Sequence, residues 1–347
     1  QNPVLTLESH GDMTIREWRD PFVWREADGG YMVVGGGRDG VGCVLRYKSE
    51  DLLHWQCLGL LYEDPAYAII ECPNLLKFGE TYVLIFSPSR EVQVRIGTLG
   101  SDGRLLEAFP GYTFDGGSWQ GYYAPQTLKR ADGRYVQWGW MPEGARGEVP
   151  AEATQVERDA RYFDWAGIQS VPRELTLDAA GRLHVEPIPE LACLRGTPVR
   201  MDRSVLTSNG TSLPLKGMQV ELQMDLHLAR DAKIELSVFQ NAQGEATRIE
   251  YDAGIGQLQI VREMSSQDPL TEKGPLSVRH ALAENGRLQL RVFLDASSVE
   301  VFADTLACLS ARVYPLDEEG GMTLRALSGG QAILDGATLW PLRGIWA

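Results

Sequence analysis

The amino-acid sequence predicts an all-β protein in which a β-propeller is followed by a β-sandwich. Two observations lead to this fold class. The first half of the chain repeats with a period near 50 residues, and each repeat has room for about four short strands. In the second half, several stretches carry apolar residues at every second position, which is typical of antiparallel strands with one buried face. Patterns with the period of an α-helix are scarce.

The repeat is marked by three prolines that lie 52 residues apart. In a propeller, the innermost strand of every blade lines the central channel, so one residue from each of several repeats can converge there. We therefore expect Asp20, Glu71 and Tyr123, which precede these prolines, to lie around one axis. The alternative, that the prolines only mark junctions between loops and strands, stays open. The three segments are Arg19-Asp20-Pro21, Glu71-Cys72-Pro73 and Tyr123-Ala124-Pro125.

Residues 1–190 hold about three and a half such repeats. A ring with fewer than four blades would leave strand edges unpaired. We therefore predict that residues 1–190 form an incomplete propeller domain whose N-terminal part is missing from this chain, and that an N-terminal fragment or a second chain completes it. After a proline-rich connector the alternating pattern begins, for example over residues 218–228 and 288–294, and residues 191–347 are predicted to form the C-terminal β-sandwich.

Composition narrows the classes of partner. The chain has 347 residues, of which 44% are hydrophobic and 23% charged, as in a folded globular protein. Its formal net charge of −14 disfavours nucleic acid and anionic membrane surfaces, and no apolar run is long enough to span a bilayer. The five cysteines and five histidines are scattered without metal-ligand spacing. We therefore expect no metal and no cofactor, and neither nucleic acid nor a membrane as partner.

Two carboxylates in the repeat suit the hydrolysis of a glycosidic bond. A retaining hydrolase needs one carboxylate as nucleophile and one carboxylic acid to protonate the leaving oxygen. Glu71 follows the apolar residues 68–70, a setting that would favour a proton donor if it stays dry. Asp20 is next to Arg19, whose guanidinium would favour an ionised carboxylate suited to binding sugar hydroxyls or stabilising a positive transition state.

Aromatic residues near the expected channel would pack on the apolar faces of sugar rings. The alternative for each of them is a place in the core of a blade. They include Trp18, Trp24, Trp119, Tyr122, Tyr123, Trp138, Trp140 and Trp165. A tryptophan-rich polar cleft therefore favours a carbohydrate ligand.

Taken in order, these segments resemble glycoside hydrolase family 32, the invertases, inulinases and levanases. The resemblance implies a five-bladed propeller joined to a β-sandwich, with Glu71 as general acid/base and Asp20 as the transition-state stabiliser that binds fructose hydroxyls. It also adds Arg19 and Gln126 to Trp18, Tyr123 and Trp165 as expected substrate-binding residues. The matching segments are Trp18-Arg19-Asp20-Pro21, Glu71-Cys72-Pro73-Asn74-Leu75, Tyr122-Tyr123-Ala124-Pro125-Gln126-Thr127, Trp165-Ala166-Gly167 with Pro172-Arg173-Glu174-Leu175, and Ser298-Val299-Glu300-Val301-Phe302.

One motif of the family is absent, namely the N-D-P-N-G segment with the nucleophilic aspartate. The other Asp-Pro pairs, at Asp64 and Asp268, lack its neighbours, and we do not expect either to be the nucleophile. We thus predict retaining hydrolysis of β-fructofuranosidic bonds in sucrose or fructans, with a nucleophile from a segment absent from this chain. Two alternatives stay open: a fructosyltransferase that uses the same acids, and a non-catalytic carbohydrate-binding remnant.

Overall fold

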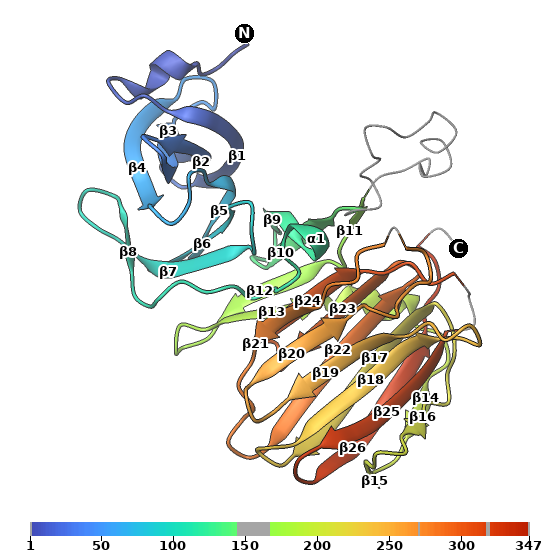
Figure 1. The fold of residues 1–347 in the computed structure, drawn as a ribbon. Coiled ribbons are helices and arrows are strands. Elements are labelled where there is room, and N and C mark those ends of the chain that lie inside the picture. The colour runs from blue at the N-terminus through green and yellow to red at the C-terminus, as the bar shows by residue number, and fades with distance from the viewer. Residues whose placement is uncertain (1, 144–166, 270, 317–319, 346–347) are drawn as a thin grey trace, which may run out of the picture.

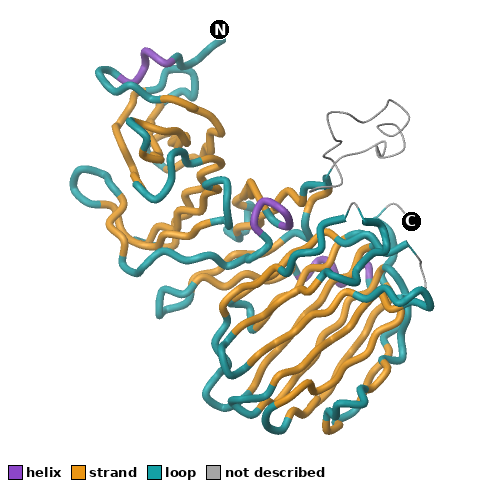
Figure 2. The backbone as a smooth tube through the Cα atoms, in the orientation of Figure 1, coloured by secondary structure: helices purple, strands orange, loops and turns teal. Residues whose placement is uncertain are grey.

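The computed structural model describes residues 2–143, 167–269, 271–316 and 320–345. Almost all regular structure in these ranges is antiparallel β-strand, as the orange segments in Figure 2 show. The few helical turns are η1 (Leu7–His10), α1 (Ser118–Gly121) and η3 (Pro189–Leu194). The prediction of an all-β protein is confirmed.

Three antiparallel sheets follow one another in residues 16–187 and occupy the upper left and centre of Figure 1. Their strands pair largely in sequence order, as in propeller blades, and none of these sheets closes on itself. The five-bladed ring stays a prediction. The first sheet contains β1 (Arg16–Glu26), β2 (Gly29–Arg38), β3 (Val41–Ser49) and β4 (Gln56–Asp64); the second contains β5 (Glu71–Phe78), β6 (Thr81–Ser87), β7 (Gln93–Leu99) and β8 (Leu105–Glu107); the third contains β9 (Tyr123–Lys129), β10 (Tyr135–Met141), β11 (Ile168–Gln169), β12 (Arg173–Leu177) and β13 (Leu183–Pro187).

The first strand of each sheet bends at the residue before its proline. Asp20, Cys72 and Ala124 have φ angles of 62°, 47° and 46°, in the left-handed region that residues with a side chain rarely adopt. The pairing register shifts around each of these positions. Such a bulge leaves a residue unpaired and turns the neighbouring side chains. The repeated proline therefore marks a repeated backbone feature of the first strands.

Two larger sheets form a sandwich at the lower right of Figure 1. The alternation in residues 218–228 is present as expected, because Val220, Leu222, Met224 and Leu226 are buried in the core between the sheets. One sheet contains β14 (Val199–Met201), β15 (Ser204–Val205), β17 (Gln219–Leu228), β22 (Arg287–Asp295), β23 (Ser298–Ala303), β24 (Ala307–Arg312) and β26 (Ala332–Pro341); the other contains β16 (Thr211–Ser212), β18 (Lys233–Gln240), β19 (Thr247–Asp252), β20 (Gln257–Val261), β21 (Leu276–Arg279) and β25 (Gly321–Ser328).

A second hydrophobic core joins the small sheets to the sandwich. Phe293, Phe302 and Cys308 of the sandwich belong to the same buried cluster as residues of β5, β6 and β12. The predicted boundary between residues 190 and 191 lies within η3, which connects β13 to β14. Because the core crosses between the two parts, the division into domains of residues 1–190 and 191–347 stays a prediction.

The same interface contains a fully buried arginine. The side chain of Arg173 has no exposed surface, and its guanidinium donates to Asp115 Oδ2 at 2.8 Å and to Glu300 Oε2 at 2.8 Å. It also lies 3.9 Å from the ring centre of Tyr122. Asp115 precedes α1 and Glu300 belongs to β23, so one side chain links three separate segments. Burial of these charges is tolerated only because each one is paired.

We predict that Arg173→Met destabilises the protein by about 3–5 kcal/mol, because it leaves the carboxylates of Asp115 and Glu300 buried without their cation. Denaturant unfolding followed by tryptophan fluorescence measures this loss. The matched control is Arg182→Met, since Arg182 has a side chain that is 61% exposed. Equal unfolding midpoints for the two variants would contradict a stabilising role for the buried pair.

Candidate active site

Glu71 is the first residue of β5, and its carboxylate accepts hydrogen bonds from both neighbouring sheets. Arg19 of β1 donates to Oε1 from Nη2 at 2.9 Å and from Nε at 3.1 Å. The hydroxyl of Tyr123, the first residue of β9, donates to Oε2 at 2.6 Å. Both partners are 52 residues from Glu71 in the sequence. The repeat thus brings three equivalent positions of successive sheets into one hydrogen-bonded chain.

Asp20 lies at the neighbouring position and has different partners. Its Oδ2 accepts the backbone N–H of Cys72 at 3.1 Å and faces the Cys72 thiol at 3.4 Å. The guanidinium of Arg19 binds Glu17 and Glu71. The expectation that Arg19 supports the charge of Asp20 stays a prediction.

Burial affects two of the groups around these carboxylates. It raises the pKa of Tyr123 above its ordinary value, and the hydrogen bond to Glu71 adds to the effect, so the phenol keeps its proton and acts as a donor. Burial also raises the pKa of the Cys72 thiol to about 12, with a further contribution from the Asp20 carboxylate. At neutral pH, Cys72 is therefore a thiol.

A hollow of about 570 Å³ lies between β9, β10 and β11. Its wall combines apolar ring faces with side-chain amides, the mixture that suits a sugar. Gln126, Trp138 and Trp140 line it, and the substrate-binding role of Gln126 stays a prediction. The sequence pointed to both tryptophans only as members of a large aromatic group. The complete lining is Ala124, Gln126, Trp138, Gly139, Trp140, Gly167, Ile168 and Gln169.

The predicted site also includes two tryptophans, Trp18 and Trp165. The ring of Trp18 packs edge-on against His10, with 4.7 Å between the ring centres, and belongs to the apolar cluster of the first sheet. Its sugar-binding role stays a prediction, and the observed contacts are those of a core residue. Trp165 lies outside the described residues.

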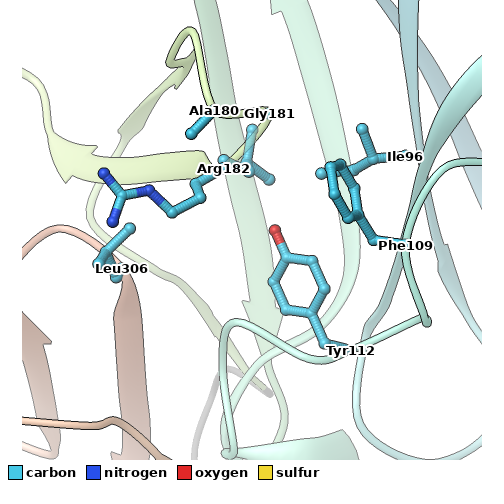
Figure 3. Close-up of a pocket in the computed structure, with 8 residues that line it drawn as sticks. Ile96, Phe109, Tyr112, Ala180, Gly181, Arg182 and Leu306 are labelled. Atoms are coloured by element: carbon cyan, nitrogen blue, oxygen red, sulfur yellow. The ribbon is translucent and has the colours of Figure 1, made fainter.

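A second hollow of about 280 Å³ lies between the second sheet, the β12–β13 turn and the sandwich. Ile96, Phe109, Tyr112 and Leu306 make its wall mainly apolar, as Figure 3 shows, and no carboxylate lines it. The hollow lined by Gln126 has no carboxylate in its wall either, so the acid that glycoside hydrolysis requires lies outside both hollows. Within the described ranges, no group of three His, Cys, Asp or Glu side chains is placed to bind a metal ion. Every helix in these ranges is too short or too polar to cross a lipid bilayer.

Some residues of the site were missed from the sequence. Ser89, in the loop after β6, donates its backbone N–H to the Tyr123 oxygen at 2.9 Å, and its Oγ lies 3.4 Å from Glu71 Oε2. Glu17 shares the guanidinium of Arg19. Neither residue precedes a proline or falls on the 52-residue register, so the repeat gave no signal for them.

We predict that iodoacetamide at pH 8 modifies Cys193 rapidly and Cys72 slowly. Cys193 is exposed, whereas Cys72 stays protonated far below its raised pKa of about 12, and only the thiolate reacts. Peptide mass spectrometry over time measures both rates. In Asp20→Asn the Cys72 rate rises, because a negative neighbour is removed. Equal rates for the two cysteines in the parent protein would contradict the buried setting of Cys72.

Comparison with known proteins gives matches along almost the whole chain. The sucrose-6-phosphate hydrolase of Escherichia coli is 30% identical over 344 residues, covering 94% of this chain and 67% of that protein. The raffinose invertase of Escherichia coli is 32% identical, with the same coverage of 94% and 67%. This chain therefore spans about two thirds of the length of these glycoside hydrolases.

Solved structures show the same fold. The GH32 β-fructofuranosidase of Bombyx mori superposes with a TM-score of 0.75 at 25% identity, over 99% of this chain and 69% of that one. Fructan 1-exohydrolase IIa of Cichorium intybus superposes with a TM-score of 0.80 at 20% identity, over 99% and 75%.

Two family models divide the chain between them. The Glycosyl hydrolases family 32 N-terminal domain matches residues 1–187, and the Glycosyl hydrolases family 32 C terminal model matches residues 190–341. These matches do not confirm that an N-terminal blade is missing, which stays a prediction. They do show the family, and this protein belongs to the glycosyl hydrolases of family 32.

Proposed function

We propose that this protein hydrolyses β-fructofuranosidic bonds of sucrose or fructans, with Glu71 as general acid/base. The observation that carries the proposal is the position of Glu71, whose carboxylate lies between Arg19 and Tyr123 at the junction of three first strands. The substrate class is supported by relatives. One solved structure is a Bombyx mori β-fructofuranosidase variant in complex with sucrose, and another is a fructan 1-exohydrolase variant in complex with 1-kestose.

In the proposed reaction, Glu71 gives its proton to the glycosidic oxygen while the bond from that oxygen to the fructosyl carbon breaks. A nucleophilic carboxylate forms a bond to the same carbon, giving a fructosyl-enzyme. Glu71, now ionised, takes a proton from water while the water oxygen bonds to the fructosyl carbon; the bond from that carbon to the nucleophilic carboxylate breaks, and fructose leaves. Retention of configuration follows from the two displacements.

Asp20 is the proposed stabiliser of the fructosyl group. Its Oδ2 is held by the Cys72 backbone, which fixes the carboxylate without neutralising it. A fixed carboxylate binds sugar hydroxyls and stabilises the positive charge that develops on the ring. Arg19, Tyr123 and Gln126 are proposed to contact the substrate around it.

The nucleophile is proposed to come from a segment outside this chain. The carboxylates near Glu71 have other partners: Glu17 binds Arg19, and Asp20 binds the Cys72 N–H. Asp64 is bound to the buried Arg95, and Asp268 follows β20 in the sandwich. Room for a further element is available at the third sheet beyond the hollow lined by Gln126, where Leu128 is 56% exposed. Large apolar side chains exposed on one sheet mark a surface for another element.

A fructosyltransferase would use the same groups and pass fructose to a sugar rather than to water. Product analysis at high sucrose separates the two activities. The other alternative is a non-catalytic carbohydrate-binding protein. Such a protein would bind sugar in the hollow near Gln126 but would show no turnover even when the nucleophile segment is supplied.

We predict that Glu71→Gln lowers turnover by about 10²–10⁴-fold in a form of the protein that cleaves sucrose, because the amide cannot donate the required proton. Release of glucose and fructose is measured by anion-exchange chromatography. The matched control is Glu80→Gln in the exposed β5–β6 turn, which we expect to be fully active. Near-normal turnover of the Glu71 variant would reject the assigned role.

For the 347-residue chain alone, we predict binding of 1-kestose without release of fructose. Titration calorimetry measures the binding, and chromatography measures any product. Asp20→Asn should weaken binding, while Asp39→Asn serves as control, because Asp39 is an exposed turn residue with a similar φ of 51°. Turnover by the purified chain alone would show that the nucleophile lies within it.

A further inference from the structure

We propose that the segment Ser87-Pro88-Ser89 is a positioning element that holds Tyr123 against Glu71. The segment comprises the end of β6 and the start of the following loop. The inference rests on the proposed function, since it concerns how the general acid is oriented. Neither serine is expected to touch the sugar or the reacting atoms.

Two cross-sheet hydrogen bonds fasten this segment to the start of β9. The buried Ser87 accepts the backbone N–H of Ala124 on its Oγ at 3.1 Å. Two residues later, the backbone N–H of Ser89 donates to the phenolic oxygen of Tyr123 at 2.9 Å. Ser87 is also the β6 partner of Glu71 in the strand pairing. The segment Ser87-Pro88-Ser89 therefore contacts both β5, the strand of Glu71, and Tyr123, the residue that donates to Glu71.

The Ser89 N–H determines where the Tyr123 proton points. A phenol has one proton to donate, and its oxygen can accept others. Because the oxygen already accepts the Ser89 N–H, its own proton is directed to the remaining acceptor, Glu71 Oε2 at 2.6 Å. Burial keeps Tyr123 protonated by raising its pKa.

The backbone of Ser89 matters more than its side chain. Its Oγ lies 3.4 Å from Glu71 Oε2, long for a hydrogen bond between oxygens. Its φ of 60° is left-handed, a conformation that glycine adopts without strain. Ser89→Gly therefore keeps the N–H donor and its geometry while removing only the weak contact.

The test follows the Glu71 carboxylate directly, in the 347-residue chain without substrate. The chain is labelled with ¹³C at glutamate carboxyls, and the Glu71 signal is assigned by its loss in Glu71→Gln. Tyr123→Phe should move the chemical shift of this signal at a fixed pH, because Glu71 Oε2 loses the hydrogen bond from the hydroxyl. Ser87→Ala should shift it in the same direction by less, since Tyr123 loses its anchor, and Ser89→Gly should leave it unchanged.

The matched control is Tyr31→Phe. It removes a tyrosine hydroxyl that donates to a different carboxylate, that of Asp28, and should leave the Glu71 signal unmoved. An unmoved Glu71 signal in Tyr123→Phe would overturn the pairing, and an unmoved Glu71 signal in Ser87→Ala would overturn the role of the segment. Neither result depends on turnover. The proposed function fails instead if Glu71→Gln remains active, so the two failures are distinguishable.

Discussion

The left-handed bend before each repeated proline is the constraint on which the site depends. It occurs at Asp20, Cys72 and Ala124, once in the first strand of each small sheet. The residue before each bend contributes its side chain to one chain of contacts, from Arg19 through Glu71 to Tyr123. The residue at the bend uses its own groups for a second contact, between Asp20 and Cys72. A one-residue shift in the pairing register of any of the three strands would move these side chains to the opposite face of the sheet, because side chains alternate along a strand.

The sandwich supports this arrangement through buried charge. Tyr122, next to Tyr123 in sequence, is covered by the guanidinium of Arg173, which in turn is held by Glu300 of the sandwich. The start of β9 is thereby fixed from one side by the sandwich and from the other by Ser87 of the second sheet. A carboxylate that transfers protons must keep its orientation within a fraction of an ångström, which rigid neighbours on both sides provide.

Much of the fold and part of the site could be predicted from the sequence. The 52-residue period is a long-range signal, since Glu71 binds Arg19 and Tyr123, each one repeat away, although the residue expected from the preceding repeat was Asp20. Adjacency in sequence did not indicate that Arg19 binds Glu71. Trp18 packs against His10, because a tryptophan near a predicted site fits a core equally well. Ser89 acts through its backbone N–H, a group that every residue except proline carries and that no motif reveals.

The central claim is that Glu71 protonates the leaving oxygen at a site assembled from equivalent positions of the three small sheets. The most direct measurement compares single-turnover rates of fructosyl transfer to the enzyme from sucrose and from β-fructofuranosyl fluoride, in a form of the protein that cleaves sucrose and in the Glu71→Gln variant of that form. Fluoride leaves with little need for a proton, whereas glucose needs one. The account predicts a large loss of rate with sucrose and a small one with the fluoride. Equal losses with both substrates would contradict it.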